Sequence, residues 1–341
     1  MPTPQVWLVT GSSRGLGLAL AQAVLAKGHR LVATARNPEH LADLARRYGD
    51  RVRTVALDVT SAAAARDAVA AATSAFGRLD VLVNNAGYAN VSSIEDVDEA
   101  DFRAQLETNF FGVFHVTRAA LPVLRAQRSG HVIQISSIGG RRGSPGLAAY
   151  QAAKWAVEGF SEVLAREVAP LGIRVTIAEP GGIRTDWAGS SMRVDAVRDD
   201  YKPSVGAFMD NVRKSHNATR GDPAKMAQAL LQVAALPEPP LRFLLGSDAV
   251  FVADLVAKQR AAEDEKWRPL SVTTDFDGLV DFAETSVASR APSTPGKARR
   301  QRAGVPARPA TEAEKERPHD HEADTDPLRL RRANDGARGD R

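Results

Sequence analysis

The 341-residue sequence predicts a single α/β domain built on one parallel sheet of about seven strands, with helices on both faces. Two observations support this prediction. Short runs rich in β-branched residues recur from residue 5 to about residue 180, and alanine-rich segments with helical spacing separate them. The runs are apolar on both faces, as parallel strands are when helices cover both sides of their sheet. The architecture indicated is a doubly wound, Rossmann-like fold.

Strands and helices alternate along the first half of the chain. Helices are expected at GLALAQAVLAKG and AAAARDAVAAATSAFG, and crossovers between the strands should be right-handed. A seventh strand, LRFLLGS, is expected between a helix over 222–236 and a helix over 250–267. The six earlier strands are expected at 5–11, 30–36, 51–59, 79–87, 130–137 and 173–181.

Composition divides the chain into a domain over 1–286 and a tail over 287–341. The tail is rich in Arg, Pro, Asp and Glu and has almost no large apolar residues, so we expect it to be disordered. Within the domain, residues 186–220 interrupt the alternation with polar sequence and scattered aromatics. Because this insertion follows a strand, and ligands bind at the carboxyl ends of strands in such sheets, we expect a mobile substrate flap.

Charge and composition argue against several classes of protein. The formal net charge is +4, but the tail holds 13 Lys and Arg against 9 Asp and Glu, leaving 32 of each sign in the domain. A neutral domain and a tail of mixed charge without aromatics do not favour a nucleic-acid partner. The chain has no cysteine, and the HDHEADTD run is expected to be solvated, so no metal site is predicted. No signal peptide or membrane-spanning run is expected, which favours a cytoplasmic protein with no membrane partner.

A glycine-rich segment, VTGSSRGLG, follows the first strand and opens the first helix. Gly11, Gly15 and Gly17 permit a tight turn and a close approach of the backbone to a ligand. Amides at the helix N-terminus would then face a pyrophosphate group. The spacing differs from the common dinucleotide fingerprint, but its place after the first strand favours nucleotide binding over a plain turn.

The end of the second strand indicates which dinucleotide binds. A strand that binds NAD ends in a carboxylate for the ribose 2′-hydroxyl, but this sequence has Ala35 followed by Arg36. Arg14 lies within the glycine loop. Two guanidinium groups near one 2′-phosphate would make charge-assisted hydrogen bonds, so we expect NADP(H).

Tyr150 and Lys154 stand four residues apart on an expected helix, in the segment YQAAK. Positions i and i+4 share a helix face, so the phenol and the ammonium group can converge on one ligand. A nearby cation stabilises phenolate, and we therefore expect Lys154 to lower the pKa of Tyr150 from its usual value of about 10. Tyr150 would then serve as an acid/base near neutral pH.

Further polar and small residues follow the strands at the same edge of the sheet. Ser137 ends the fifth strand, where its hydroxyl can hydrogen-bond a carbonyl oxygen. Asn109 interrupts an apolar helix, where an amide without a role or a partner would be destabilising. NNAG ends the fourth strand and suits close approach of a cofactor, and PGGIRT follows the sixth strand.

With these motifs in this order, the chain resembles the short-chain dehydrogenase/reductase family from about Val6 to Asp254. The resemblance rests on TGSSRGLG, NNAG, Asn109, Ser137 before YQAAK, and PGGIRT. It implies an oxidoreductase that transfers a hydride between NADP(H) and a carbonyl or secondary alcohol. A serine often precedes the lysine in this family, whereas this chain has Ala153.

The resemblance also implies roles for individual residues. Ser137 would polarise the carbonyl oxygen, Tyr150 would exchange the proton, and Lys154 would hold the nicotinamide ribose and lower the pKa of Tyr150. Asn109 would bind a water through its backbone and complete a proton relay, which makes these four the catalytic residues. The implied cofactor-binding residues are Gly11, Ser13, Arg14, Gly15, Leu16, Gly17, Arg36, Asp58, Val59, Asn85, Ala86, Gly87, Tyr150, Lys154, Pro180, Gly181, Ile183 and Thr185.

Two expectations concern partners, and one alternative concerns function. Apolar side chains in and near the flap favour an apolar small-molecule substrate, and the apolar helices over 101–128 and 150–169 are expected to pair in a homodimer or homotetramer. The alternative function is an NADP(H)-sensing regulator without turnover, against which the intact Ser137, Tyr150 and Lys154 set argues. The side chains considered for the substrate are Trp187, Met192, Tyr201, Phe208 and Met209, with Tyr88 and Trp155 nearby.

Overall fold

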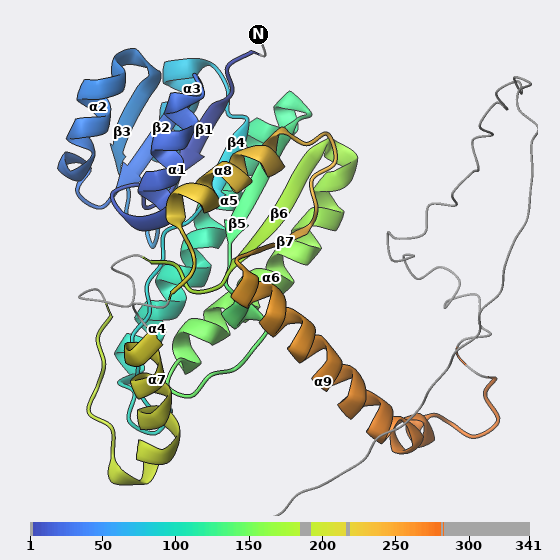
Figure 1. Ribbon diagram of the computed structural model, residues 1–341. Helices are drawn as coiled ribbons and strands as arrows, with labels where there is room; N and C mark the ends of the chain where they lie inside the picture. Colours follow the sequence, from blue (N-terminus) through green and yellow to red (C-terminus); the bar gives the residue numbers. More distant parts are fainter. Residues whose placement is uncertain (1–2, 185–191, 216–218, 281, 283–341) are drawn as a thin grey trace, which may run out of the picture. The chain divides into compact units, whose positions relative to one another are not determined.

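The computed structural model describes residues 3–184, 192–215, 219–280 and 282 (Figure 1). One sheet has the strand order β3-β2-β1-β4-β5-β6-β7, and every neighbouring pair is parallel. The prediction of a doubly wound fold with a seventh strand is therefore confirmed. The strands are β1 (Val6–Val9), β2 (Arg30–Ala35), β3 (Val52–Ala56), β4 (Val81–Asn84), β5 (Gly130–Ile135), β6 (Ile173–Pro180) and β7 (Arg242–Leu245).

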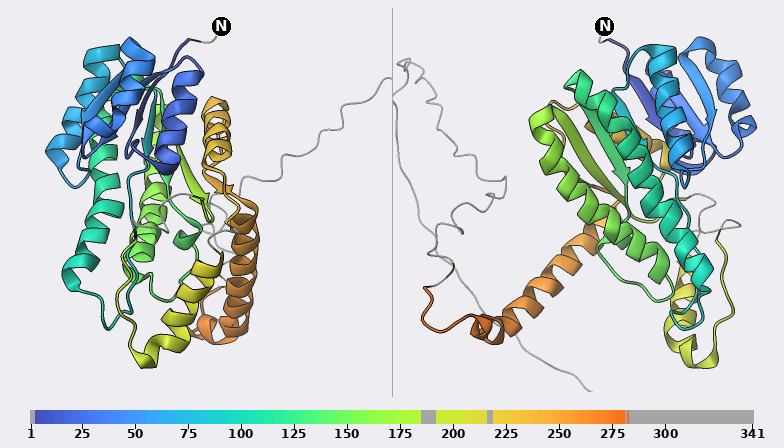
Figure 2. Two further views of the ribbon diagram at one scale, coloured as in Figure 1. Left: turned by 60° about the vertical axis from the view of Figure 1, so that its left-hand side comes forward. Right: turned by 180° about the vertical axis from the view of Figure 1, so that it is seen from behind.

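Helices cover both faces of this sheet (Figure 2). One face packs against α1 (Gly15–Ala26), α2 (Ala42–Tyr48) and α8 (Pro223–Ala235). The other packs against α3 (Ala62–Phe76), α5 (Gly112–Gln127) and α6 (Ala148–Val168). The remaining α-helices of the described chain are α4 (Glu99–Leu106), α7 (Ala207–Ser215) and α9 (Ser247–Ser271).

The alternation of side chains along β1 explains why both faces of the sheet are apolar. Trp7 and Val9 pack among the residues of α1 and α8, whereas Val6 and Leu8 pack among those of α3 and α5. All four side chains are buried. Because successive residues of a strand point to opposite faces, a strand covered on both sides must be apolar at every position.

The segment expected as one helix over 101–128 is instead two helices joined by a π-helical turn. α4 ends at Leu106, the turn spans Glu107–Phe111, and α5 begins at Gly112. Asn109 lies inside this turn and is fully buried. Single π-turns occur frequently at functional sites, which agrees with the candidate role of this residue.

The chain divides into a compact unit over Met1–Thr274 and a second unit over Asp275–Arg341. The expected boundary at 286 and the tail over 287–341 fall outside the described residues, as do Thr185 and Trp187. Phe111, Trp155 and Val163, on the helices expected to pair between subunits, are exposed, and the assembly itself stays a prediction.

Two kinds of feature are absent from the part of the chain that the structure describes. None of the described helices combines the length and the apolar character that crossing a membrane requires. Among the same residues, no cluster of three or more histidine, aspartate or glutamate side chains is arranged to hold a metal ion.

His131, a buried histidine on β5, makes folding sensitive to acid. Its Nε2 lies 2.9 Å from the Thr176 hydroxyl, and burial lowers its pKa from 6.5 to about 4. The unfolded chain binds a proton at this residue near its ordinary pKa and the folded chain only near 4, so stability falls as the pH drops between these values. We expect this residue to lower the free energy of unfolding of the wild type by ~3 kcal/mol over that pH range. His131→Leu should not show this decrease.

Urea unfolding at several pH values in this range measures the free energy of unfolding of the wild type and of His131→Leu. That of the wild type should decrease more steeply as the pH falls. A constant difference in unfolding free energy between the two proteins at every pH would contradict the assignment.

Candidate active site

A cavity of about 830 Å³ opens at the carboxyl ends of the strands. The glycine loop after β1, the ends of β2 and β4, the turn after β5 and the end of β6 all contribute to its wall. Every predicted site residue that the structure describes lines this cavity, and Thr185 lies outside the described residues. Residues from segments far apart in the chain thus meet in one place, as expected at the switch point of a doubly wound sheet.

The glycine loop has the tight backbone that its sequence predicts. Gly11 and Gly15 adopt φ angles of 67° and 56°, in the left-handed region that favours glycine. A Cβ atom on Gly17 would lie 2.5 Å from Asn85 Nδ2 and closer still to the Gly11 carbonyl. α1 begins at Gly15, and its first amides have no side-chain cap. The close packing of the loop therefore depends on glycine at position 17, and the uncapped N-terminus of α1 lines the cavity.

Asn85 ties the end of β4 to the glycine loop. Its Nδ2 donates to the carbonyl oxygens of Thr10 and Gly11 at 2.9 and 3.2 Å. The backbone amides of Asn85 and Ala86 in turn donate to the Thr10 hydroxyl. These bonds fix the two strand ends together, so the NNAG segment supports the loop as well as lining the cavity.

An exposed arginine follows the end of β2 at the cavity wall. Arg36 is exposed, lines the cavity, and makes no hydrogen bond or ion pair with any residue that the structure describes. Arg14 lines the same cavity from the glycine loop. Asp58, beyond the end of β3, accepts hydrogen bonds from the Thr60 amide and hydroxyl at 3.0 and 2.8 Å. The guanidinium of Arg36 is therefore available to an anionic group.

Tyr150 and Lys154 sit on α6, as predicted, and both are almost fully buried. The Lys154 ammonium donates to the Ile135 carbonyl at 2.7 Å and lies 5.7 Å from the centre of the Tyr150 ring. Burial lowers the pKa of Lys154 to about 8. The sequence could place the pair on one face, but it could not reveal how far each group is removed from water.

The expected lowering of the Tyr150 pKa is wrong for this structure. Burial raises the pKa of Tyr150 to about 12, and a hydrogen bond with Ser137 offsets only part of that rise. The ammonium group of Lys154 is turned to a backbone carbonyl, so it does not reverse the effect of desolvation. Tyr150 is consequently a neutral phenol near neutral pH, which suits it to donate a proton.

Ser137 begins the turn that follows β5. Its Oγ accepts from the Gly139 amide at 3.0 Å, and its hydrogen bond with Tyr150 joins the two hydroxyl groups. Ser136 also lines the cavity, but it is more deeply buried. Ser137 is the serine whose hydroxyl is hydrogen-bonded to the phenol at the cavity wall.

Asn109 has the partners that a buried amide needs. Its Nδ2 donates to the carbonyls of Tyr88 and Gln105 at 2.9 and 2.8 Å, and its Oδ1 accepts from the Tyr88 amide at 3.1 Å. A Cβ atom on Gly87 would lie 2.5 Å from that same Oδ1. The Asn109 side chain thus holds the segment after β4 in place through its hydrogen bonds with Tyr88. The expected contact between the Asn109 backbone and a water molecule stays a prediction.

Residues 192–215, which form most of the described part of the flap, contribute side chains that pack around Tyr150. Val205 and Met209 are buried in one cluster with Tyr150, and Tyr201 packs against it. Tyr201 also donates from its hydroxyl to Glu95 at 2.8 Å, which ties the flap to the loop before α4. The mobility expected of the flap stays a prediction.

Several residues of the cavity wall were not identified from the sequence. Of the aromatic residues considered for the substrate, Phe208 and Tyr88 line the cavity, whereas Trp155 donates from Nε1 to the Gly139 carbonyl. The segment GRRGSPGL, between two recognised motifs, contains three of the others, Arg142, Ser144 and Leu147. The unidentified residues include Thr108, Ile138, Gly139, Arg142, Ser144, Leu147, Gln151 and Val252.

Comparison with known proteins gives a consistent result. The sequence profile described as short chain dehydrogenase matches residues 5–194. Oxidoreductase BOA17 of Botryotinia fuckeliana is 54% identical over 271 residues, covering 79% of this chain and 99% of the relative. The 3-ketodihydrosphingosine reductase of Bacteroides thetaiotaomicron is 36% identical, covering 82% of this chain and 96% of the relative. The crystal structure of a short-chain dehydrogenase from Streptomyces avermitilis is 39% identical with a TM-score of 0.75, covering 81% of this chain and 100% of that chain.

Proposed function

Because the chain belongs to the short-chain dehydrogenase family, we propose that it interconverts a carbonyl group and a secondary alcohol with NADP(H), using Tyr150 as the acid/base. The observation that carries this proposal is one cavity that holds both the glycine loop and the Ser137, Tyr150 and Lys154 side chains. The loop suits a dinucleotide, and the two hydroxyl groups suit an oxygen that changes its charge during reaction.

The choice of NADP(H) is supported by the residues that would surround its adenosine end. Gly17 lets the loop pack closely against the Gly11 carbonyl and Asn85, because a side chain there would meet both, and the loop's amides can then face a pyrophosphate. Arg36 follows Ala35 where a ribose-binding carboxylate would otherwise stand, and its guanidinium can bind a 2′-phosphate through two parallel hydrogen bonds. When bound, the nicotinamide group supplies or accepts the hydride.

The residues of α6 and of the turn after β5 supply the proton and hold the oxygen. In the reducing direction the phenol of Tyr150, with its pKa near 12, holds a proton that it gives to the carbonyl oxygen. Ser137 hydrogen-bonds the same oxygen, and Lys154, still largely protonated at neutral pH with a pKa of about 8, stabilises the phenolate left on Tyr150. Asn109 holds the segment beside this site in place.

The substrate proposed is a small carbonyl compound with an apolar portion. Val205, Met209 and Phe208 form an apolar cluster with Tyr150, and Phe208 reaches the cavity wall. The relative from Bacteroides thetaiotaomicron is named as a ketone reductase, which supports reduction of a carbonyl group as the direction.

Oxidation of NADPH in the presence of aliphatic and aromatic ketones and aldehydes tests the proposed function. We expect turnover with at least one apolar carbonyl compound and weaker turnover with small polar ones, because the cavity beside Tyr150 has apolar walls. Binding of NADPH without turnover of any carbonyl or alcohol would favour the sensing alternative and contradict the proposal.

A further inference from the structure

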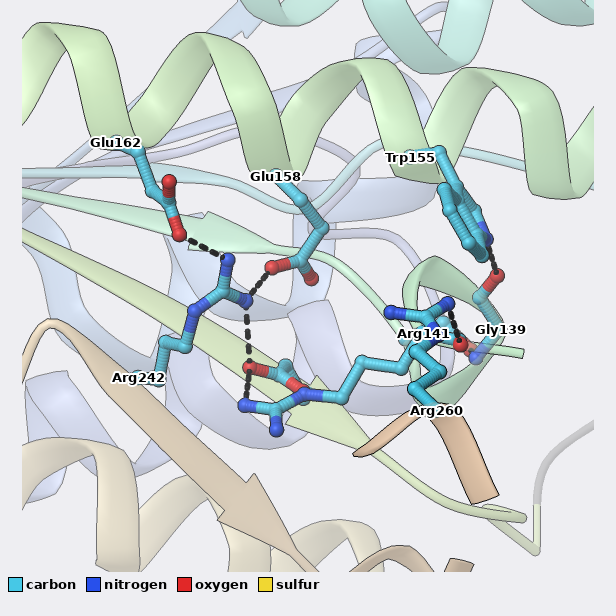
Figure 3. A network of polar contacts seen from close by, with 9 residues as sticks. Gly139, Arg141, Trp155, Glu158, Glu162, Arg242 and Arg260 are labelled. Atoms are coloured by element: carbon cyan, nitrogen blue, oxygen red, sulfur yellow. Dashed lines mark hydrogen bonds and ion pairs between the residues drawn. The ribbon is translucent and has the colours of Figure 1, made fainter. Parts of the chain in front are cut away.

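Two arginines and three glutamates form a continuous network beside the catalytic helix (Figure 3). Arg141 donates from Nε and Nη2 to the two carboxylate oxygens of Glu179, with the second bond measuring 2.8 Å. Arg242, on β7, donates to the same carboxylate at 3.1 Å. It also donates to Glu158 and, at 2.6 Å, to Glu162, both of which lie on α6. The network therefore joins β6, β7, α6 and the turn after β5.

One end of the network is fixed to the turn Ser137–Arg141. Backbone hydrogen bonds of 2.8 and 3.0 Å close this segment into a single turn, with Arg141 as its last residue. Trp155, on α6, donates from Nε1 to the Gly139 carbonyl at 3.0 Å. Arg260, on α9, donates from Nη2 to the Arg141 carbonyl at 2.7 Å. The position of Arg141 thus sets the position of the whole turn.

The other end of the network lies on the face of α6 that carries the acid/base pair. Tyr150, Lys154, Glu158 and Glu162 follow one another at intervals of four residues, so each lies beside the one before it along the helix. The first two line the cavity and the last two hold Arg242. A continuous set of polar contacts therefore runs from this face of α6 to the turn that begins with the reactive serine.

Glu179 is the centre of the network and is fully buried. It directly precedes Pro180, where β6 ends at the cavity wall. A buried ion pair often adds no stability over apolar residues of the same volume, so stability alone does not account for two guanidinium groups on one buried carboxylate. What a bidentate pair provides is a defined distance and angle between the elements that it joins.

We propose that Arg141 and Glu179 are positioning residues, which hold the Ser137 hydroxyl in line with the Tyr150 phenol so that both reach one substrate oxygen. Neither residue lines the cavity, so both act through the turn Ser137–Arg141. This inference rests on the proposed function, because that function assigns Ser137 and Tyr150 to the substrate oxygen.

Kinetics of three variants test this inference. Glu179→Gln removes the negative charge. Arg141→Lys keeps the positive charge but loses the bidentate geometry of the guanidinium group. Arg141→Met with Glu179→Met removes both charges of this pair. We expect kcat to fall on the order of 10- to 100-fold in all three, with the Kd for NADPH and the KM for the carbonyl compound close to those of the wild type. The double variant should regain the thermal stability that Glu179→Gln loses, but it should not regain kcat.

A matched control separates positioning from a general loss of stability. Leu230→Ala, at a fully buried site of α8 in the core on one face of the sheet, should lower Tm and leave kcat unchanged at a temperature where all the variants are folded. Wild-type kcat in the single variants, or recovery of kcat together with Tm in the double variant, would overturn the inference.

Amide hydrogen exchange gives a readout that needs no substrate. The amides of residues 139–141 should exchange faster in Glu179→Gln than in the wild type and should be unchanged in Leu230→Ala. Unchanged exchange in Glu179→Gln would overturn the positioning inference whether or not a substrate is known. The two proposals can fail separately. If the wild type oxidised no NADPH with any carbonyl compound, while residues 139–141 still exchanged faster in Glu179→Gln, the proposed function would be overturned and the inferred coupling between Glu179 and the turn would stay supported.

Discussion

Replacing Tyr150 by phenylalanine is expected to lower kcat on the order of 10²- to 10⁴-fold, the range typical of a lost general acid. The variant keeps the ring that packs against Val205 and Met209 and loses only the hydroxyl that hydrogen-bonds Ser137. The Kd for NADPH should therefore change little. Steady-state NADPH oxidation and a nucleotide-binding titration on the same protein measure the two quantities.

Tyr48→Phe is the matched control for this loss. Tyr48 lies on α2, away from the cavity wall, and its ring faces the guanidinium groups of Arg47 and Arg51. Removal of its hydroxyl should leave kcat and Kd as in the wild type. If Tyr150→Phe retained wild-type kcat, Tyr150 would not be the proton donor.

Replacing Arg36 by aspartate is expected to reverse the preference between the two dinucleotides. The new carboxylate can accept hydrogen bonds from a ribose 2′-hydroxyl and repels a 2′-phosphate. A charge-assisted hydrogen bond contributes about 1.5–3 kcal/mol, so kcat/KM for NADPH should fall roughly 10- to 100-fold, while that for NADH should rise.

Arg66→Gln controls for the loss of a positive charge at the surface. Arg66 is exposed on α3 and does not line the cavity. Its substitution should leave the ratio of kcat/KM for NADPH and NADH unchanged. An unchanged ratio in Arg36→Asp as well would mean that the end of β2 does not select the cofactor.

The elements that the sequence predicts well are those set by local pattern. β1 is apolar at every position and β4 at its first three, and Gly11, Gly15 and Gly17 mark the turn between β1 and α1, so their structure follows from neighbouring residues. The Tyr150 and Lys154 pair could be placed on one helix face for the same reason. Periodicity along one element was sufficient for these features.

The features that sequence reasoning missed depend on contacts between distant residues. Arg141 and Glu179 are 38 positions apart, and Arg242 and Glu179 are 63 apart, so no local pattern pairs them. The direction of the Tyr150 pKa shift was missed for a related reason. The neighbouring lysine is visible in the sequence, but the burial that outweighs it is known only once the flap and α6 are packed.

Transfer of deuterium from the cofactor to the product tests the central claim most directly. The enzyme would be supplied with NADPH that carries deuterium at both hydrogen positions of nicotinamide C4, together with the best carbonyl compound found among the ketones and aldehydes. The account predicts that the alcohol product gains one deuterium on its carbinol carbon and that Tyr150→Phe suppresses its formation. An alcohol product without deuterium at that carbon would contradict direct hydride transfer in this cavity.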